Sequence, residues 1–130
     1  MAEPVWLRSD VVSAIHNRQL AEHGGPTGIR DEGLLESALA AQENRWRYER
    51  CSIPELAACY AFHVAGNHSF IDGNKRTAHV CMRLFLKLNG MDLVADQHEK
   101  VRMMVDLSAG QLSFDELAEW LVATSEPIPA

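Results

Sequence analysis

Most of this chain repeats apolar residues at helical spacing, and this pattern limits its possible folds more than any other feature. Residues that favour helix ends mark the boundaries of the helical segments. Ser9 and Asp10 can cap a first helix, which stops at Gly24-Gly25. Asp31 can cap a second helix, and Pro54 suits the first turn of a third. The N-terminal half is therefore predicted to be helical.

The C-terminal half continues the helical pattern. A long helix is predicted from about Asn74 to Asn89, because its residues are mostly apolar or strong helix formers and Gly90 closes the segment. Two capping-box patterns, in which a capping residue is followed three positions later by glutamate, open further helices: Asp96 with Glu99, and Ser113 with Glu116. These two helices are predicted to end near Gly110 and Thr124.

Extended structure is predicted at few positions. Only Leu93-Val94-Ala95 and parts of the loop from Gly24 to Arg30 have a suitable composition, and no convincing pair of strands is visible. The predicted fold is therefore all-α, a single compact domain of about six helices over residues 1–124 with the helix from Asn74 at its centre. Residues 125–130 contain prolines and are predicted to form a short tail.

The segment from His68 to Thr77 has the composition of a functional site rather than of a packed core. It combines an imidazole, a carboxylate, a glycine-asparagine turn and two adjacent cations, and it leads directly into the long helix. The N-terminus of a helix presents unpaired N–H groups and a partial positive charge, which attract phosphate. A base, a metal ligand and an anion site in one loop indicate transfer of a phosphate-containing group.

Composition argues against several other classes of protein. The formal net charge of −6 disfavours direct binding to nucleic acid, which requires a basic surface. No apolar run approaches the roughly 18 residues of a membrane span, and the first residues do not resemble a secretion signal. The 3 cysteines are odd in number and form no Cys-x-x-Cys pair, so buried thiols are expected rather than disulfides. We therefore expect a cytoplasmic protein.

The segment from His68 to Thr77 closely resembles the signature of Doc toxins, the short branch of the Fic superfamily. Two further blocks are similar to the same family. Residues 24–39 resemble its upstream block, and residues 85–90 resemble the segment that closes its motif helix. The three blocks stand in the family's order and together cover most of residues 20–90.

This resemblance implies a compact helical Fic fold and a toxin–antitoxin system with a Phd-type antitoxin as partner. It also implies Mg²⁺ and ATP, and it makes residues 24–30 the loop that positions the target. Fic enzymes that transfer AMP carry glycine where this chain has Lys75, whereas Doc-type members carry lysine and are protein kinases. In the family's explanation, the lysine fills the position that the α-phosphate takes in AMP-transferring enzymes. ATP therefore binds in the reverse orientation and presents its γ-phosphate. The implied reaction is phosphorylation of a Ser or Thr hydroxyl of elongation factor Tu, which arrests translation.

Two residues of the motif are candidates for the chemical step. His68 is the candidate catalytic base, because an imidazole with an ordinary pKa of about 6.5 is mostly neutral and still basic near neutral pH. Asp72 is the candidate Mg²⁺ ligand, since Mg²⁺ commonly takes one or two carboxylates and completes its shell with phosphate oxygens and water. Asp72 could also cap the helix that follows, and the two roles can coexist.

Four further residues are candidates for binding the phosphates of ATP: Gly73, Asn74, Lys75 and Arg76. Glycine lets the backbone approach a phosphate closely. The Asn74 amide can donate to a phosphate oxygen or cap the helix. Lys75 supplies a point charge, and Arg76 supplies a planar fork that matches phosphate oxygens. Cations of this kind are expected in an enzyme of phosphoryl transfer, because they position the phosphates and neutralise their charge.

One departure from the family's pattern leaves alternatives open. Doc-like chains usually carry arginine two residues before the motif histidine, where this chain has Gly66. Loss of one charge-assisted contact typically costs about 1.5–3 kcal/mol. A slow kinase, or a catalytically weakened module that binds an antitoxin, would fit this change. AMP transfer to a protein hydroxyl is a further alternative, which Lys75 disfavours.

Overall fold

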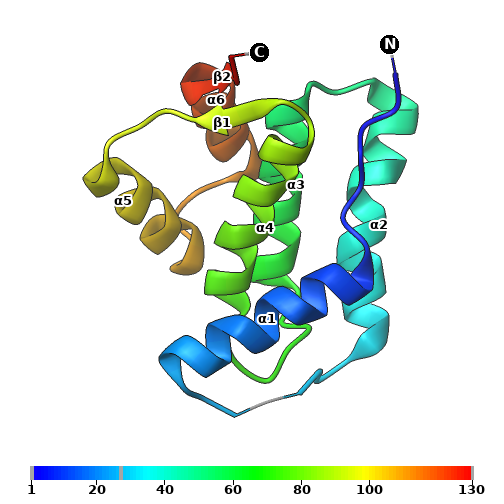
Figure 1. Ribbon diagram of the computed structural model, residues 1–130, viewed down its shortest axis with the longest axis vertical. Helices are drawn as coiled ribbons and strands as arrows, with labels where there is room; N and C mark the ends of the chain where they lie inside the picture. The colour runs from blue at the N-terminus through cyan, green and yellow to red at the C-terminus, as the bar shows by residue number, and fades with distance from the viewer. Residues whose placement is uncertain (1, 27, 130) are drawn as a thin grey trace.

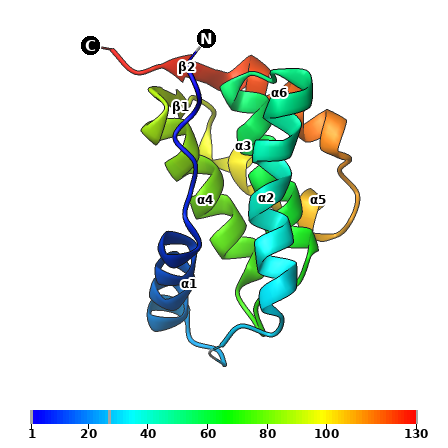
Figure 2. The ribbon, with the colours of Figure 1, turned by 90° about the vertical axis from the view of Figure 1, so that its right-hand side faces the viewer.

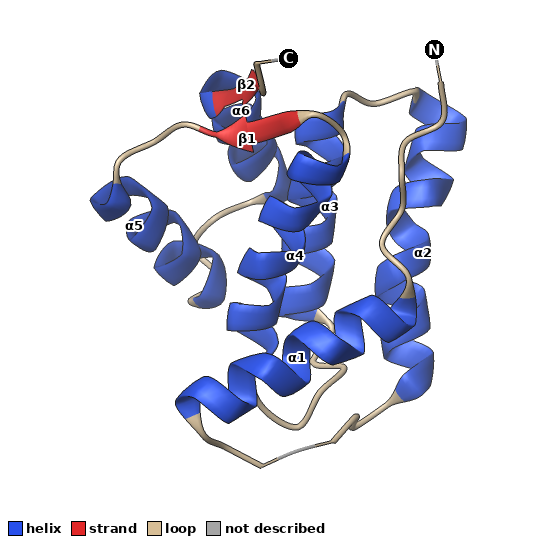
Figure 3. Cartoon of the chain, in the orientation of Figure 1, coloured by secondary structure: helices blue, strands red, loops and turns tan. Residues whose placement is uncertain are grey.

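The computed structural model describes residues 2–26 and 28–129 of the chain. These residues form six helices and one two-stranded sheet (Figure 1 and Figure 3). The helices are α1 (Ser9–His23), α2 (Glu32–Glu49), α3 (Ile53–Gly66), α4 (Asn74–Leu88), α5 (Gln97–Ser108) and α6 (Phe114–Thr124), and the strands are β1 (Met91–Leu93) and β2 (Ser125–Pro127). The prediction of about six helices is confirmed. Of these six, none combines the length and the apolar character needed to cross a membrane.

Helix α3 forms the centre of the core. It packs against α2, α4 and α6, and Figure 2 shows α2, α3 and α4 running side by side. A helix that is apolar on nearly all sides is stable only when it is surrounded. Most of α3 is accordingly buried: Pro54, Leu56, Ala57, Ala58, Cys59, Tyr60, Ala61, Val64 and Ala65.

Helix α4 packs along α3 through one apolar face. The buried positions of that face recur at helical spacing: Ala78, Cys81, Met82, Phe85 and Leu86. The ring of Phe85 lies 4.8 Å from the ring of Tyr60 on α3, measured between centroids. Full burial of a side chain such as Phe85 contributes about 1.5–3 kcal/mol. This packing fixes the position of the α4 N-terminus beside the C-terminus of α3, where the motif loop joins the two helices.

The predicted helix caps are largely confirmed. The Asp31 side chain accepts a hydrogen bond from the Leu34 N–H, and Ser113 and Glu116 form a complete capping box. The box predicted for α5 is half formed: Asp96 accepts from the Glu99 N–H, but the Glu99 carboxylate accepts instead from the indole of Trp120. A further box, Ser52 with Glu55, opens α3 and was missed in the sequence.

The prediction that Ser9 or Asp10 caps the first helix is wrong. Both residues lie inside α1, and the capping position belongs to Arg8, which makes no side-chain cap bond. The Asp10 carboxylate turns back to Arg8, with 3.1 Å between the charged groups. An acidic residue in the first turn still interacts favourably with the helix dipole, which explains its place there.

The chain does contain a pair of strands, contrary to the prediction. β1 and β2 are antiparallel, with Met91 opposite Pro127 and Leu93 opposite Ser125. The start of the predicted tail is therefore part of the fold, and the Ile128 N–H donates to the Gly90 carbonyl. Each strand has three residues, which is too short for an alternating pattern to be visible in the sequence. Pro127 is tolerated because a two-stranded sheet has only edge strands.

The expectation of buried, unpaired cysteines is confirmed for Cys51, Cys59 and Cys81. Burial raises the pKa of Cys59 to about 11 and the pKa of Cys81 to about 12. Because the thiolate is the reactive form, we expect a disulfide reagent to label the folded protein very slowly at neutral pH and all three thiols after denaturation. Absorbance of the released thiol measures both rates. Rapid labelling of the folded protein would contradict the burial of these side chains.

Candidate active site

The motif loop between α3 and α4 is held in shape by its own asparagine. The Asn74 side-chain carbonyl accepts from the Phe70 N–H, and its amide donates to the Phe70 carbonyl, both at 3.0 Å. The Phe70 side chain is buried and anchors the loop in the core. Both the oxygen and the nitrogen of the Asn74 carboxamide are therefore hydrogen-bonded to the Phe70 backbone. The sequence predicts a phosphate contact or a helix cap for this side chain. It forms no cap bond at the start of α4, and its second amide hydrogen and its backbone N–H stay predicted donors to a phosphate.

His16 of α1 is a second anchor of the loop, and it was not predicted from the sequence. Its imidazole is buried and stacks on the Phe70 ring, with 3.8 Å between centroids and 10° between planes. Its Nε2 lies 2.6 Å from the Asp72 carbonyl oxygen, which can only accept, so Nε2 carries the proton. The spacing of His16 from the buried Val12 and Leu20 placed it on the inner face of α1, and this signal was available in the sequence.

The loop is also braced by the segment that precedes α2. Ile29 and Phe70 form an isolated antiparallel bridge, which confirms that part of the Gly24–Arg30 loop is extended. The Ser69 carbonyl accepts from the N–H groups of both Arg30 and Asp31, at 2.8 and 3.2 Å. Thr27, within this loop, lies outside the described residues. The segment implied to position the target is thus hydrogen-bonded directly to the motif.

All six residues predicted for the site line one pocket of about 410 Å³ at the N-terminus of α4. Its lining residues are Ala65, His68, Ile71, Asp72, Gly73, Asn74, Lys75 and Arg76. Gly73 is the capping residue of α4, at φ +79°, and it has no side chain to accept from the first-turn N–H groups. No acidic residue lies in that turn. The helix dipole, free N–H groups and two cations therefore act together on an anion in this pocket.

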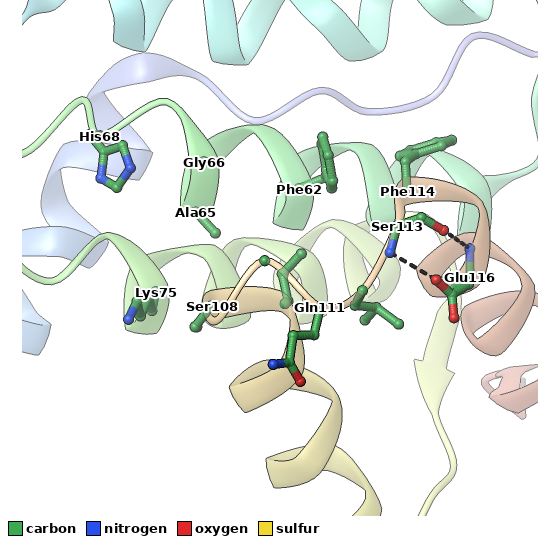
Figure 4. A pocket seen from close by; sticks show the side chains of 13 residues that line it. Phe62, Ala65, Gly66, His68, Lys75, Ser108, Gln111, Ser113, Phe114 and Glu116 are labelled. Atoms are coloured by element: carbon green, nitrogen blue, oxygen red, sulfur yellow. Dashed lines mark hydrogen bonds between the residues drawn. The ribbon is translucent and has the colours of Figure 1, made fainter.

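A larger pocket of about 650 Å³ adjoins the first. Figure 4 shows it between the end of α3, the start of α4 and the α5–α6 connection. Its walls are mostly apolar and include Phe62, Leu112 and Phe114. His68 and Lys75 line both pockets. The candidate base and the lysine typical of Doc-type members therefore lie where the two pockets meet.

Comparison with known proteins identifies the family of this chain. A model of the Fic/DOC family matches residues 6–86, which is more than half of the sequence. The chain belongs to the Fic/Doc family. It is 33% identical over 109 residues to "Protein kinase doc" of Escherichia phage P1, covering 83% of this chain and 86% of that protein. It is 41% identical over 76 residues to "Toxin Doc" of Mycolicibacterium smegmatis, covering 56% of this chain and 58% of that protein.

In this Fic/Doc chain, the Asp72 carboxylate lies open at the start of α4, where it could hold a cation. It is exposed in the smaller pocket, and one oxygen accepts from the Gly73 N–H at 2.8 Å. The other oxygen lies 2.7 Å from the point where a Cβ on Gly25 would stand, so a side chain at position 25 would displace the Asp72 carboxylate. The described residues contain no cluster of three metal-binding side chains. A single carboxylate can hold a cation when phosphate oxygens and water complete its shell.

The surroundings of two other histidines in this Fic/Doc chain lower their pKa values. Burial lowers the pKa of His63, and the nearby Arg45 lowers it further. Burial also lowers the pKa of His79, with added repulsion from Arg83 and Lys100. Neither residue lines the two pockets, whereas His68 lines both and is exposed. Among these three, only His68 is placed to receive a proton from a bound substrate.

Proposed function

We propose that this protein is a Doc-like toxin that transfers the γ-phosphate of ATP to a Ser or Thr hydroxyl of a translation factor, elongation factor Tu. The observation that carries this proposal is the pocket in which His68, Asp72 and two cations meet at the N-terminus of α4. The names of the two relatives, a protein kinase doc and a toxin Doc, support a kinase with a toxic effect. The proposed action is cytoplasmic, where its target would be found.

Each side chain of the pocket has a part in the proposed reaction. The target hydroxyl gives its proton to the His68 imidazole while its oxygen attacks the γ-phosphorus, and ADP leaves as the bond to the β-phosphate oxygen breaks. Lys75, Arg76 and the first-turn N–H groups neutralise the phosphate charge. Asp72 would hold Mg²⁺ against the phosphates, and the ion would neutralise charge developing during transfer.

The choice between phosphate and AMP transfer depends on Lys75. Lys75 lines both pockets. This place is compatible with the family's explanation, in which the lysine fills the position that an α-phosphate takes in the AMP-transferring orientation. This position favours γ-phosphate transfer. The alternative of a weakened, antitoxin-binding module is favoured by one observation, the glycine at position 66, which lines the larger pocket beside His68.

Gly66→Arg is expected to increase the rate of phosphate transfer by about one to two orders of magnitude, the effect of one restored charge-assisted contact. The site has room, because no heavy atom lies within 4 Å of a Cβ built at Gly66. The value of kcat/KM for ATP measures the gain. Gly66→Gln is the control, because it improves the helix to a similar degree without adding charge. An equal gain from Gln would show that the missing cation is irrelevant.

We propose a Phd-type antitoxin as the partner that blocks this activity. The toxin proposal is tested by adding the purified protein with ATP and Mg²⁺ to a bacterial cell-free translation system. Protein synthesis is expected to stop, and addition of the antitoxin beforehand is expected to prevent the arrest. Continued synthesis with the wild-type protein, under conditions where it is folded, would contradict the proposed function.

A further inference from the structure

We propose that Arg30 is a positioning residue for His68, which it holds through the backbone rather than through the imidazole. The Arg30 Nε donates to the His68 carbonyl oxygen at 2.9 Å. Arg30 takes part in none of the ion pairs formed by the described residues, so this bond is the one described use of its side chain. The inference rests on the proposed role of His68 as the base.

His68 needs such a restraint because its backbone is in an unfavourable conformation. Its φ is +52°, and among the described residues only Arg50 is another non-glycine with a positive φ. The left-handed region is sparsely populated by residues with a Cβ, and it persists only where neighbouring contacts impose it. A peptide that relaxed to the right-handed or extended region would turn the imidazole away from the junction of the two pockets.

Neighbouring carbonyls of the loop are each held by a different donor. Ser69 accepts from two backbone N–H groups, Phe70 accepts from Asn74, and Asp72 accepts from His16. The His68 carbonyl is held by the Arg30 side chain. Of these contacts, the bond from Arg30 is the one made to His68, the residue proposed as the base. Removing it frees the strained peptide and leaves the rest of the loop pinned.

A pair of substitutions at Arg30 separates the hydrogen bond from the charge. In Arg30→Gln the amide nitrogen stands as many bonds from the backbone as the arginine Nε, so the donor is kept and the charge is lost. In Arg30→Met the side chain still reaches the position of Nε, but the donor is lost. Arg18→Met is the control, because Arg18 is an exposed arginine that pairs only with Glu22 on the same helix.

We expect Arg30→Met to lower kcat about tenfold and to leave the KM for ATP within about twofold, since the phosphate-binding groups are untouched. Arg30→Gln is expected to retain most of kcat, and Arg18→Met all of it. Wild-type kcat in Arg30→Met would overturn the proposal. A loss in Arg30→Gln equal to that in Arg30→Met would also overturn it, because the charge and not the hydrogen bond would then matter.

A second measurement separates this proposal from the proposed function. The ¹³Cα and ¹³Cβ chemical shifts of His68 report its backbone conformation in the absence of any substrate. They are expected to change in Arg30→Met and to stay near wild type in Arg30→Gln. Unchanged shifts in Arg30→Met would overturn the Arg30 contact. If wild type transfers AMP instead of phosphate, the kinase assignment fails, but the same comparison of kcat between variants still tests Arg30.

Discussion

Replacement of His68 by alanine is expected to reduce the rate of phosphate transfer by about 10²–10⁴-fold, the usual contribution of a general base. His68 lines both pockets, and its exposed side chain contributes little to the core, so the fold should be unaffected. The measurement is transfer of label from ATP in a single turnover, together with thermal unfolding of each variant. Growth arrest on expression should disappear with the same substitution.

Two matched variants make the His68 result interpretable. His68→Asn keeps a residue that tolerates the left-handed backbone of this position but lacks a basic nitrogen, and it should be as inactive as alanine. His23→Ala removes another exposed histidine, at the end of α1 and outside both pockets, and it should keep full activity. Undiminished transfer by folded His68→Ala or His68→Asn would remove His68 from the mechanism.

Lys75→Gly is expected to abolish γ-phosphate transfer and to open the route to AMP transfer. The substitution removes a four-carbon stem and one cation from the junction of the two pockets, while Arg76 and the α4 N-terminus remain to hold phosphate. An α-phosphate could then take the position vacated by the lysine. Glycine in the first turn of a helix costs at most about 1 kcal/mol, so the variant should still fold.

The products of Lys75→Gly are compared with those of wild type, using ATP labelled at the α- or the γ-phosphate. Lys87→Gly serves as a control, because it places the same substitution in α4 but away from both pockets. If Gly66 cripples both reactions, the variant loses γ-transfer without gaining AMP transfer, and the Gly66→Arg background should reveal the gain. Full kinase activity in Lys75→Gly would contradict the assignment of phosphate transfer from Lys75.

Local signals in the sequence were sufficient to locate the motif at the start of α4. Glycine and asparagine preceding an apolar run mark a helix N-terminus, and the structure places the six predicted site residues there around one pocket. Local signals also predicted the caps at Asp31 and Ser113, because a cap bonds only three residues ahead. They failed at Ser9, since a residue suited to capping is equally suited to the first turn.

Contacts between distant segments could not be predicted in this way. The bond from His16 to the Asp72 carbonyl joins residues 56 positions apart, and the bond from Arg30 to His68 joins residues 38 apart. Neither depends on a local pattern, because each exists only once α1 and the segment before α2 pack onto the motif loop. The pairing of β1 with β2 was missed for the same reason, because the register of the two strands depends on where α6 ends.

Transfer of label to purified elongation factor Tu tests the central claim most directly. The wild-type protein is incubated with Mg²⁺, elongation factor Tu and ATP that carries label on either the γ- or the α-phosphate. We expect ATP labelled at the γ-phosphate to label a Ser or Thr of the factor and ATP labelled at the α-phosphate to leave it unlabelled. With His68→Ala, neither form of ATP should label the factor. Label from α-ATP on the factor would show AMP transfer and contradict the account, as would the absence of both labels with folded wild-type protein.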